Sequence, residues 1–509
     1  LDLIVDRVEQ HPVKDAVLTT ITMKDRIYPF TVKMYYKAYQ QIDMIETWVE
    51  VSHNEKKAVV LKRFDSGHFL IRRADVWISS LHGHWGAETQ LESEPLVSGM
   101  KVIKNMDGIR NGLGDHSEVM FSLDGKPQEN SGRVIGAALC WSGRTKIRVD
   151  MDDTFGRSVH SIFAGMNEEA SEYKLEPEEV FTTPVLALTY SQEGIGGASR
   201  NFHRWARAGM VHGCDKPRDI LLNSWEGVYL NMNDIASMGG ELFVMDDGWF
   251  GRKYRRINDN SSLGDWVVDT EKLPNGIQGL TDTAKKYGIK FGIWIEPEFT
   301  NTKSELIDNH PDWVLRAGSR ELSCGRGGTQ VALDLCNPKV QDFVFHVVDT
   351  LLANYPDIAY IKWDANGELL NYGSSYLPKD KQSHIYIDYH RGLVRVMERI
   401  RAKYPDVVIQ ACGSGGGRVS YGVMPYFDEF WVSDNTDALQ RLFIQWGTSY
   451  FYPSIAMAQH VSASPNHQTG RVVPLKFRFD VAMTGRLGME IQPKNMTDEE
   501  KDFSKKAIA

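Results

Sequence analysis

The stretch Lys290-Phe291-Gly292-Ile293-Trp294-Ile295-Glu296-Pro297-Glu298 decides the fold. An apolar run of strand length ends abruptly in acidic residues. Outward from this stretch, strand-like runs alternate with helical patterns from about residue 201 onward. The candidate strands are Ile220 to Asn223, Glu241 to Met245, Lys290 to Ile295, Gln330 to Leu333, Ala359 to Trp363, Val407 to Ala411, Glu429 to Val432 and Thr448 to Tyr452. Eight such units in about 275 residues predict a (β/α)8 barrel, for which about 250 residues is usual.

The clearest helical pattern between these strands runs from Tyr389 to Tyr404. Leu393, Val396 and Ile400 share one face of it, as an amphipathic helix requires. An open, doubly wound sheet is the alternative arrangement of strands and helices. The absence of a G-x-G-x-x-G motif after the first strand argues against that sheet and favours the barrel.

The first half of the chain has a different pattern, in which apolar residues recur at every second position. The run Ile45 to Val51 alternates in this way, as a half-buried strand does. Further strand-like runs are Ala58 to Phe64, Phe69 to Ile71, Ser117 to Leu123, Val134 to Trp141 and Val185 to Tyr190. Many strands without a convincing helix predict a β-sandwich.

The chain therefore divides into two main domains. At about 150 residues per domain, its 509 residues fit three domains, or one barrel with a companion. We expect an N-terminal β-sandwich over residues 1–198, a linking helix over 199–216, a catalytic (β/α)8 barrel over 217–492 and a polar C-terminal stub over 493–509.

Composition excludes several functions. With 42% hydrophobic and 25% charged residues, the chain is an ordinary globular protein. No apolar run approaches the ~18 residues of a membrane span, which argues against a membrane role. The net charge of −9 and the lack of a Lys/Arg-rich block argue against nucleic-acid binding. The five cysteines are scattered without a CxxC motif, so we expect no disulfide framework and favour a cytoplasmic location over a periplasmic or secreted one.

Acidic residues and tryptophans gather where the predicted barrel strands end. In a barrel, the residues after the carboxyl ends of the strands face the active site. Those acids and tryptophans are Trp225, Glu226, Asp246, Asp247, Trp249, Trp294, Glu296, Glu298, Asp334, Trp363, Asp364, Trp431 and Asp434. Such a set suits cleavage of glycosidic bonds, in which one carboxylate attacks the sugar and a second carboxylic acid protonates the leaving oxygen.

The motifs themselves resemble glycoside hydrolase family 36, the α-galactosidase (melibiase) family. They are Asp246 to Phe250, Ser262 to Trp266, Trp294 to Glu298, Lys362 to Asp364, Trp431 to Asp437 and His460 to Arg471. The resemblance implies an N-terminal β-supersandwich before the barrel. It also implies a retaining enzyme that removes terminal α-linked galactose from melibiose- or raffinose-type oligosaccharides without a cofactor.

By position in these motifs, the resemblance implies that Asp364 is the nucleophile and Asp434 the general acid/base. Lys362 lies two positions before Asp364, so both side chains point the same way along a strand, and an ammonium there would favour the ionised nucleophile. The apolar bulk of Trp431 would raise the pKa of Asp434. For a retaining enzyme we expect the two carboxyl groups about 5–5.5 Å apart.

The resemblance also implies which residues bind the sugar. Asp246 and Asp247 match residues that bind the 4- and 6-hydroxyls of galactose, and without histidine partners a metal site there is disfavoured. Trp294, Lys362, Asn366 and Trp431 resemble lining residues. Cys412 and the loop containing Gly415 resemble the wall near the 2-position of the sugar, and the glycine lets the backbone come close.

Two departures from the family pattern concern substrate contacts. Ala365-Asn366-Gly367 replaces the usual Met-Asn-Arg, and Arg326 stands two residues away from its usual place before Gln330. The alternatives are therefore an α-N-acetylgalactosaminidase, a raffinose-type α-galactosyl transferase and, in a different class, a non-catalytic sugar-binding barrel. A lectin has no need of a nucleophile, which argues against the last.

Three further expectations come from the resemblance. The segment His82 to Glu88, with Trp85, resembles a loop that reaches toward an active site, sometimes that of a neighbouring subunit. We therefore count Trp85 among the substrate-binding residues and expect a homo-oligomer. Because relatives usually add a C-terminal β-domain, and the chain begins at Leu1 without a Met, we expect it to be a piece of a longer enzyme.

Overall fold

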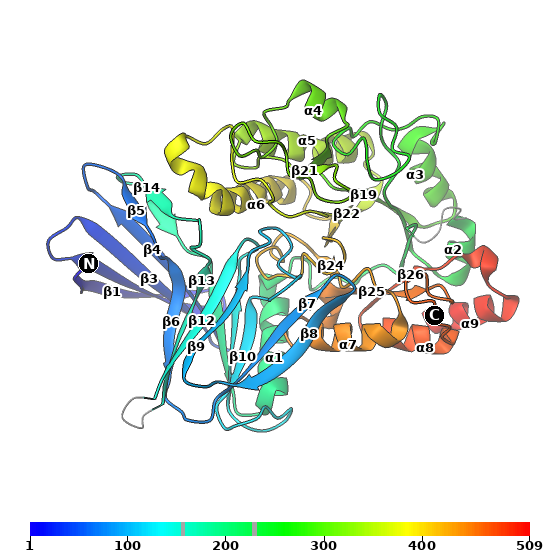
Figure 1. Ribbon diagram of the computed structural model, residues 1–509. Coiled ribbons are helices and arrows are strands. Elements are labelled where there is room, and N and C mark those ends of the chain that lie inside the picture. The colour runs from blue at the N-terminus through cyan, green and yellow to red at the C-terminus, as the bar shows by residue number, and fades with distance from the viewer. Residues whose placement is uncertain (154–157, 226–231) are drawn as a thin grey trace.

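The structure is a computed structural model that describes residues 1–153, 158–225 and 232–509. An antiparallel β-region occupies the N-terminal part, and a closed barrel surrounded by helices follows it (Figure 1). The two fold classes expected from the sequence, a β-sandwich and then a (β/α)8 barrel, are therefore confirmed.

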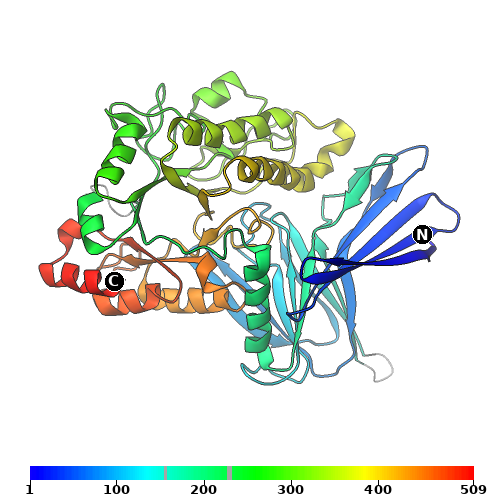
Figure 2. The same ribbon diagram turned by 180° about the vertical axis from the view of Figure 1, so that it is seen from behind.

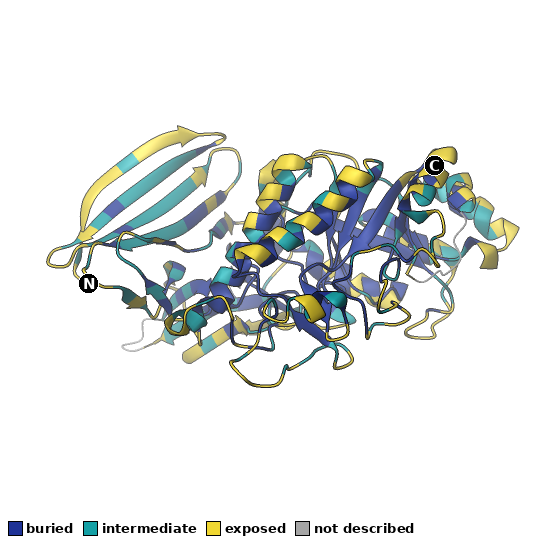
Figure 3. Cartoon of the chain, turned by 90° about the horizontal axis from the view of Figure 1, so that it is seen from above, coloured by how far each residue is buried: buried dark blue, intermediate teal, exposed yellow. Residues whose placement is uncertain are grey.

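The larger N-terminal sheet has ten strands, and their pairs are antiparallel. Its order is β1 (Leu3–Val13), β2 (Ala16–Asp25), β3 (Phe30–Tyr39), β4 (Met44–His53), β16 (Leu186–Ser191), β11 (Val134–Leu139), β10 (Glu118–Ser122), β7 (Trp77–His84) and β8 (Ala87–Pro95), with β15 (Val180–Thr182) beside β4. The strands nearest the N-terminus project away from the rest of the molecule and carry mostly exposed and half-buried residues (Figure 3).

A second sheet covers the central strands of the first. Its order is β6 (Asp65–Ile71), β13 (Val159–Met166), β12 (Thr145–Asp152) and β9 (Gly99–Asn105), and β14 (Tyr173–Leu175) pairs separately with β5 (Val59–Leu61). In β12, Thr145, Ile147 and Val149 are buried while the residues between them are half-buried, which is the expected period of two. Phe121 of the first sheet and Ile162 of the second share one apolar core, so the sheets form a sandwich.

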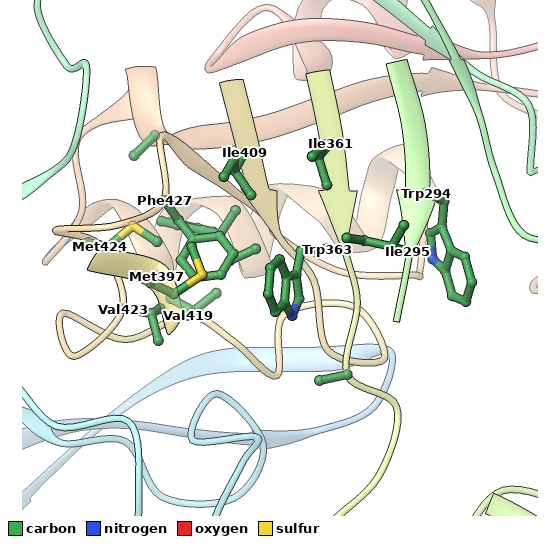
Figure 4. Packing of buried hydrophobic residues seen from close by; sticks show 14 of the residues in the cluster. Trp294, Ile295, Ile361, Trp363, Met397, Ile409, Val419, Val423, Met424 and Phe427 are labelled. Carbon is green, nitrogen blue, oxygen red and sulfur yellow. The ribbon is translucent and has the colours of Figure 1, made fainter. Parts of the chain in front are cut away.

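Eight parallel strands form the closed barrel. They are β17 (Leu221–Asn223), β18 (Leu242–Met245), β19 (Lys290–Ile295), β22 (Ile358–Trp363), β23 (Val408–Ala411), β24 (Glu429–Trp431), β25 (Met457–Ser462) and β26 (Arg486–Glu490). Six of the sequence-based strands coincide with these elements. Trp294 and Ile295 project to opposite sides of β19, and Ile295 packs toward Ile361 and Trp363 (Figure 4).

Two of the predicted barrel strands were wrong. Residues 330–333 contribute β21 (Gln330–Ala332), which pairs antiparallel with β20 (Phe299–Asn301) outside the barrel. Residues 448–452 form the end of helix α7 (Ala438–Ser449) and the turn after it. Their apolar side chains are buried against the core, and burial rather than strand pairing explains the apolar run. The true seventh and eighth strands are β25 and β26.

Helices surround the barrel and join it to the sandwich (Figure 2). They are α1 (Gly194–Trp205), α2 (Met232–Met238), α3 (Gly276–Lys286), α4 (Glu305–Asn309), α5 (Pro338–Asn354), α6 (Ile385–Lys403), α7, α8 (Leu475–Ala482) and α9 (Asp498–Ile508). The amphipathic pattern at 389–404 lies in α6, as predicted. The polar end, expected as a stub, instead folds into α9, which begins with a capping box at Thr497 and Glu500. Among the described residues, no helix has both the length and the apolar character to cross a membrane.

Candidate active site

A pocket with an empty volume of about 450 Å³ opens where the barrel strands end. The residues that line it are Trp225, Asp246, Asp247, Trp294, Arg326, Lys362, Asp364, Asn366, Cys412, Trp431, Asp434 and Glu490. Ten of these are the sequence-predicted site residues. Trp225 was noted only as a strand-end tryptophan, Glu490 was not predicted, and Glu226, the strand-end acid beside Trp225, lies outside the described residues. Gly415 and Trp85 do not line this pocket, but both contact it through Asp434.

Asp364 follows the last residue of β22 and is buried at the base of the pocket. Its Oδ2 accepts hydrogen bonds from Nδ2 of Asn366 at 2.7 Å and from Nε1 of Trp294 at 3.2 Å. Its Oδ1 accepts from the backbone N–H of Ala365 at 2.9 Å. Three donors therefore fix this carboxylate and balance its negative charge.

Asp434 lies in the loop after β24, between two tryptophans. Its Oδ1 accepts from Nε1 of Trp431 at 3.1 Å and its Oδ2 from Nε1 of Trp85 at 2.9 Å. Burial raises the pKa of Asp434, the Trp85 hydrogen bond opposes the rise, and the negative charge of Asp364 adds to it. The raised pKa agrees with the sequence-based expectation, but the hydrogen bond from Trp431, the residue named there as the cause, lowers the pKa of Asp434.

Two buried ion pairs hold the adjacent acids of the second strand end. The sequence pattern had placed the ammonium of Lys362 beside Asp364. In the structure its Nζ instead lies 2.7 Å from Oδ2 of Asp246, so Lys362 pairs with Asp246. The guanidinium of Arg256 binds both oxygens of Asp247, at 3.0 and 2.6 Å. Burial opposes the charge of Lys362, but the carboxylate of Asp246 outweighs it and raises the pKa of Lys362. Burial raises the pKa of Asp247, and the hydrogen bond and positive charge of Arg256 oppose this rise.

Arg326 reaches the pocket although it stands two residues away from its usual place. Its backbone has a φ of 33°, and its guanidinium bonds to Asp259 at 3.0 and 3.1 Å. Burial lowers the pKa of Arg326, but the surrounding acids, first Glu296 and then Asp259, raise it further than burial lowers it. The displaced arginine therefore remains a cation of this pocket.

The loop after β23 forms the remaining wall. Cys412 is buried there, and burial raises the pKa of its thiol. Gly415 has a φ of 83°, and a Cβ on it would lie 2.6 Å from the backbone nitrogen of Asp434. Only glycine fits this close approach between the loop and the residue that carries the second carboxylate.

Glu490 is the pocket acid that sequence reasoning missed. It ends β26, and its Oε1 accepts from Nδ2 of Asn223 at 2.5 Å. Burial raises the pKa of Glu490, but hydrogen bonding to His460 and the charges of His460 and Lys362 lower it overall. A correct eighth strand would have placed this acid at the barrel mouth, since strand ends gather there.

In the described part of the chain, no group of three or more His, Cys, Asp and Glu side chains is arranged to hold a metal ion. The five cysteines, each within that part, have free thiols.

Two carboxylates and several tryptophans at the mouth of one barrel define a glycoside hydrolase. Comparison with known proteins agrees, because the Melibiase family model matches residues 180–509 and the Glycosyl hydrolase family 36 N-terminal domain matches residues 6–176. The chain belongs to glycoside hydrolase family 36, the α-galactosidase (melibiase) family.

Similar proteins cover nearly the whole chain. Alpha-galactosidase AgaA of Geobacillus stearothermophilus is 37% identical over 97% of this chain and 68% of its own length. Alpha-galactosidase C of Emericella nidulans is 35% identical over 95% of this chain and 65% of its own length. Variants of AgaA solved with raffinose and with stachyose each superimpose with a TM-score of 0.95 at 33% identity, over 100% of this chain and 73% of theirs.

Proposed function

We propose that this α-galactosidase removes terminal α-linked galactose from raffinose- and stachyose-type oligosaccharides by a retaining double displacement. The main support for this mechanism is that Asp364 and Asp434 lie in one pocket but differ in their surroundings. Three hydrogen-bond donors compensate the charge of Asp364, whereas burial raises the pKa of Asp434. AgaA, a relative with the same fold, binds raffinose and stachyose in its solved complexes.

In the first step, an oxygen of Asp364 bonds to the anomeric carbon while the glycosidic C–O bond breaks. Asp434 transfers its proton to the leaving oxygen. In the second step, water bonds to the anomeric carbon, the ester bond to Asp364 breaks, and Asp434 takes the proton of the water. The same two residues therefore serve both steps, and neither step needs a cofactor.

The remaining pocket residues hold the galactose. We propose that Asp246 and Asp247 accept hydrogen bonds from its 4- and 6-hydroxyls, with Lys362 beside the first acid. Arg326, Asn366, Trp294 and Trp431 line the pocket around the ring. Cys412 and the loop that contains Gly415 form the wall near the 2-position, and Trp85 covers the acid/base from the sandwich side.

A cytoplasmic location and a homo-oligomeric assembly are also part of the proposal. The five free thiols support a reducing compartment. The hairpin that carries Trp85 contacts the pocket of its own chain, so a neighbouring subunit is not needed to supply this tryptophan. Light scattering of the purified protein tests the assembly, and a monomeric mass would contradict it.

The decisive experiment is Asp364→Asn, assayed with 4-nitrophenyl α-galactoside. We expect turnover to be abolished while galactose binding stays detectable by calorimetry. Comparison with the N-acetylgalactosaminide analogue tests which sugar the enzyme accepts, and we expect the wild type to hydrolyse the galactoside faster. Unchanged turnover by Asp364→Asn would contradict the mechanism, and preferential turnover of the analogue would contradict the substrate.

A further inference from the structure

Glu296 directly follows β19 and is completely buried beneath the pocket. Its Oε1 accepts from Nε2 of Gln330 and from the backbone N–H of Asn366, each at 2.5 Å. Its Oε2 accepts from Nδ2 of Asn366 at 3.0 Å. Both oxygens of Glu296 therefore bind the same asparagine, one through its backbone and one through its side chain.

The side chain of Asn366 uses its whole hydrogen-bonding capacity in this arrangement. One hydrogen of Nδ2 goes to Glu296, and the other goes to Oδ2 of Asp364 at 2.7 Å. Its Oδ1 accepts from the backbone N–H of Ser414 at 2.8 Å and from Oγ of Ser414 at 3.0 Å. An amide has two donor hydrogens and two acceptor lone pairs, and here each has a partner. Asn366 is thus engaged with two carboxylates before any sugar arrives.

We propose that Glu296 is a positioning residue for the reaction, which holds the Asn366 amide in the orientation that donates to Asp364. This inference rests on the proposed role of Asp364 as nucleophile. Without Glu296, the amide has no acceptor on its far side, and it can rotate or shift away from Asp364. The nucleophile then loses the shorter of the two hydrogen bonds on its Oδ2.

Electrostatics couples the two carboxylates as well. Burial raises the pKa of Glu296 to about 7, and the negative charge of Asp364 adds to the rise, whereas the nearby Arg326 charge opposes it. Because formation of the ester at Asp364 removes that negative charge, the first reaction step relieves part of the repulsion on Glu296. The charge of Glu296 therefore responds to the state of the nucleophile.

The neighbouring acid Glu298 shows what a purely structural carboxylate looks like here. It is also fully buried, but it accepts from Trp363 Nε1 at 2.9 Å and Tyr389 OH at 3.0 Å and pairs with Arg418. None of these partners lines the pocket. Only Glu296, of this pair of acids, connects to Asp364 through a single side chain.

The test is a double-mutant cycle with Glu296→Gln, Asn366→Ala and the double variant. The glutamine keeps the shape but replaces one acceptor with an N–H₂ group that faces other donors. We expect kcat for 4-nitrophenyl α-galactoside to fall about 100-fold in Glu296→Gln, the scale on which a misplaced catalytic group acts. The inhibition constant of galactose should change by less than about 3-fold, and Glu296→Gln should add little to Asn366→Ala because they share one interaction.

Asp334→Asn is the matched control, because Asp334 is a fully buried carboxylate that accepts from Cys336 N at 3.1 Å and Ser374 Oγ at 2.5 Å away from the pocket. It should keep the kcat of the wild type. If Glu296→Gln does not fold, Gln330→Met removes one partner of Glu296 and should lower kcat while the galactose inhibition constant stays unchanged.

Three outcomes would overturn the inference: a wild-type kcat in Glu296→Gln, effects of the two substitutions that multiply, or a galactose inhibition constant that rises in parallel with the loss of kcat. A wild type without α-galactosidase activity would instead overturn the proposed function itself.

Discussion

The indole nitrogen of Trp85 lies 2.9 Å from Oδ2 of Asp434, although the first residue belongs to the N-terminal sandwich and the second to the barrel. The same hairpin, between β7 and β8, accepts a hydrogen bond at Gly86 O from Nδ2 of Asn435 at 2.9 Å. Its Glu88 accepts from Oγ of Ser433 at 2.5 Å. The sandwich therefore fixes the loop that carries Asp434, the proposed acid/base, on both sides of this residue.

Replacing Trp85 by phenylalanine removes the N–H donor and keeps an aromatic ring. The hydrogen bond stabilises ionised Asp434, so its loss raises the pKa of this carboxyl further. Because the proposed first step needs protonated Asp434, the alkaline limb of kcat/KM should move to higher pH in Trp85→Phe. The pH profile is measured with melibiose, whose sugar leaving group requires the acid.

Trp77→Phe is the control for this experiment. Trp77 donates to Asp75 at 3.2 Å on the exposed rim of the sandwich, far along the strand from the hairpin. Its replacement should leave the pH profile in place. A limb that stays fixed in Trp85→Phe, or moves to lower pH, would show that the indole does not stabilise the carboxylate.

Gly415→Ala should nearly abolish activity. The new Cβ would lie 2.6 Å from Asp434 N and 2.7 Å from Oε1 of Glu88, in a buried region that has no room to adjust. We expect kcat to fall about 100-fold as Asp434 is displaced. Gly288→Ala is the control, since Gly288 also has a positive φ, 71°, but nothing lies within 4 Å of its Cβ position. Equal activity losses in both variants would assign the effect to backbone strain alone.

The strands that the sequence predicted well are those with apolar interiors. β19 coincides with its predicted range, and β22 and β23 differ from theirs by one residue at one end. β25 and β26 were not predicted from the sequence, because polar side chains fill their side of the barrel. Arg486 of β26 pairs inside the barrel with Glu429, to which Tyr360 OH also donates at 2.7 Å. β25 contains Gln459 and His460, and β26 begins with Arg486 and ends with Glu490, so neither strand has the long apolar run by which strands are recognised.

The residues of the candidate site can also be separated into those that the sequence predicted and those that it did not. Asp364 and Asp434 are recognisable because each follows an apolar strand within a long motif. Glu490 could not be found without the correct eighth strand. The ion pair between Arg256 and Asp247 depends on how a loop folds back over the barrel mouth, which no local pattern specifies. Sequence motifs therefore located the two carboxylates that the structure brings into one pocket, and tertiary structure was needed for the partners that hold them.

Lys362→Met should destabilise the protein. The ion pair of Lys362 with Asp246 is buried, and removal of the cation leaves the carboxylate without compensation. We expect the free energy of unfolding to fall by about 3–5 kcal/mol, measured by urea denaturation at pH 7. Lys476→Met, which breaks the exposed pair with Asp480, should leave stability nearly unchanged. Similar losses in both variants would mean that burial of the pair has no special effect.

The stereochemistry of the product distinguishes nucleophilic attack by Asp364 from activation of water by the same residue. Both oxygens of this carboxylate are held by donors from the chain, Oδ1 by Ala365 N and Oδ2 by Asn366 and Trp294. A carboxylate fixed in this way, in the same pocket as the second carboxyl, suits direct attack on the anomeric carbon, and two inversions at that carbon give net retention. Proton NMR of freshly cleaved substrate should therefore show α-galactose first, with β-galactose appearing only as the sugar mutarotates. Early β-galactose would require a water molecule between sugar and carboxylate, hence a separation of about 6.5–9.5 Å between the two carboxyl groups instead of about 5–5.5 Å.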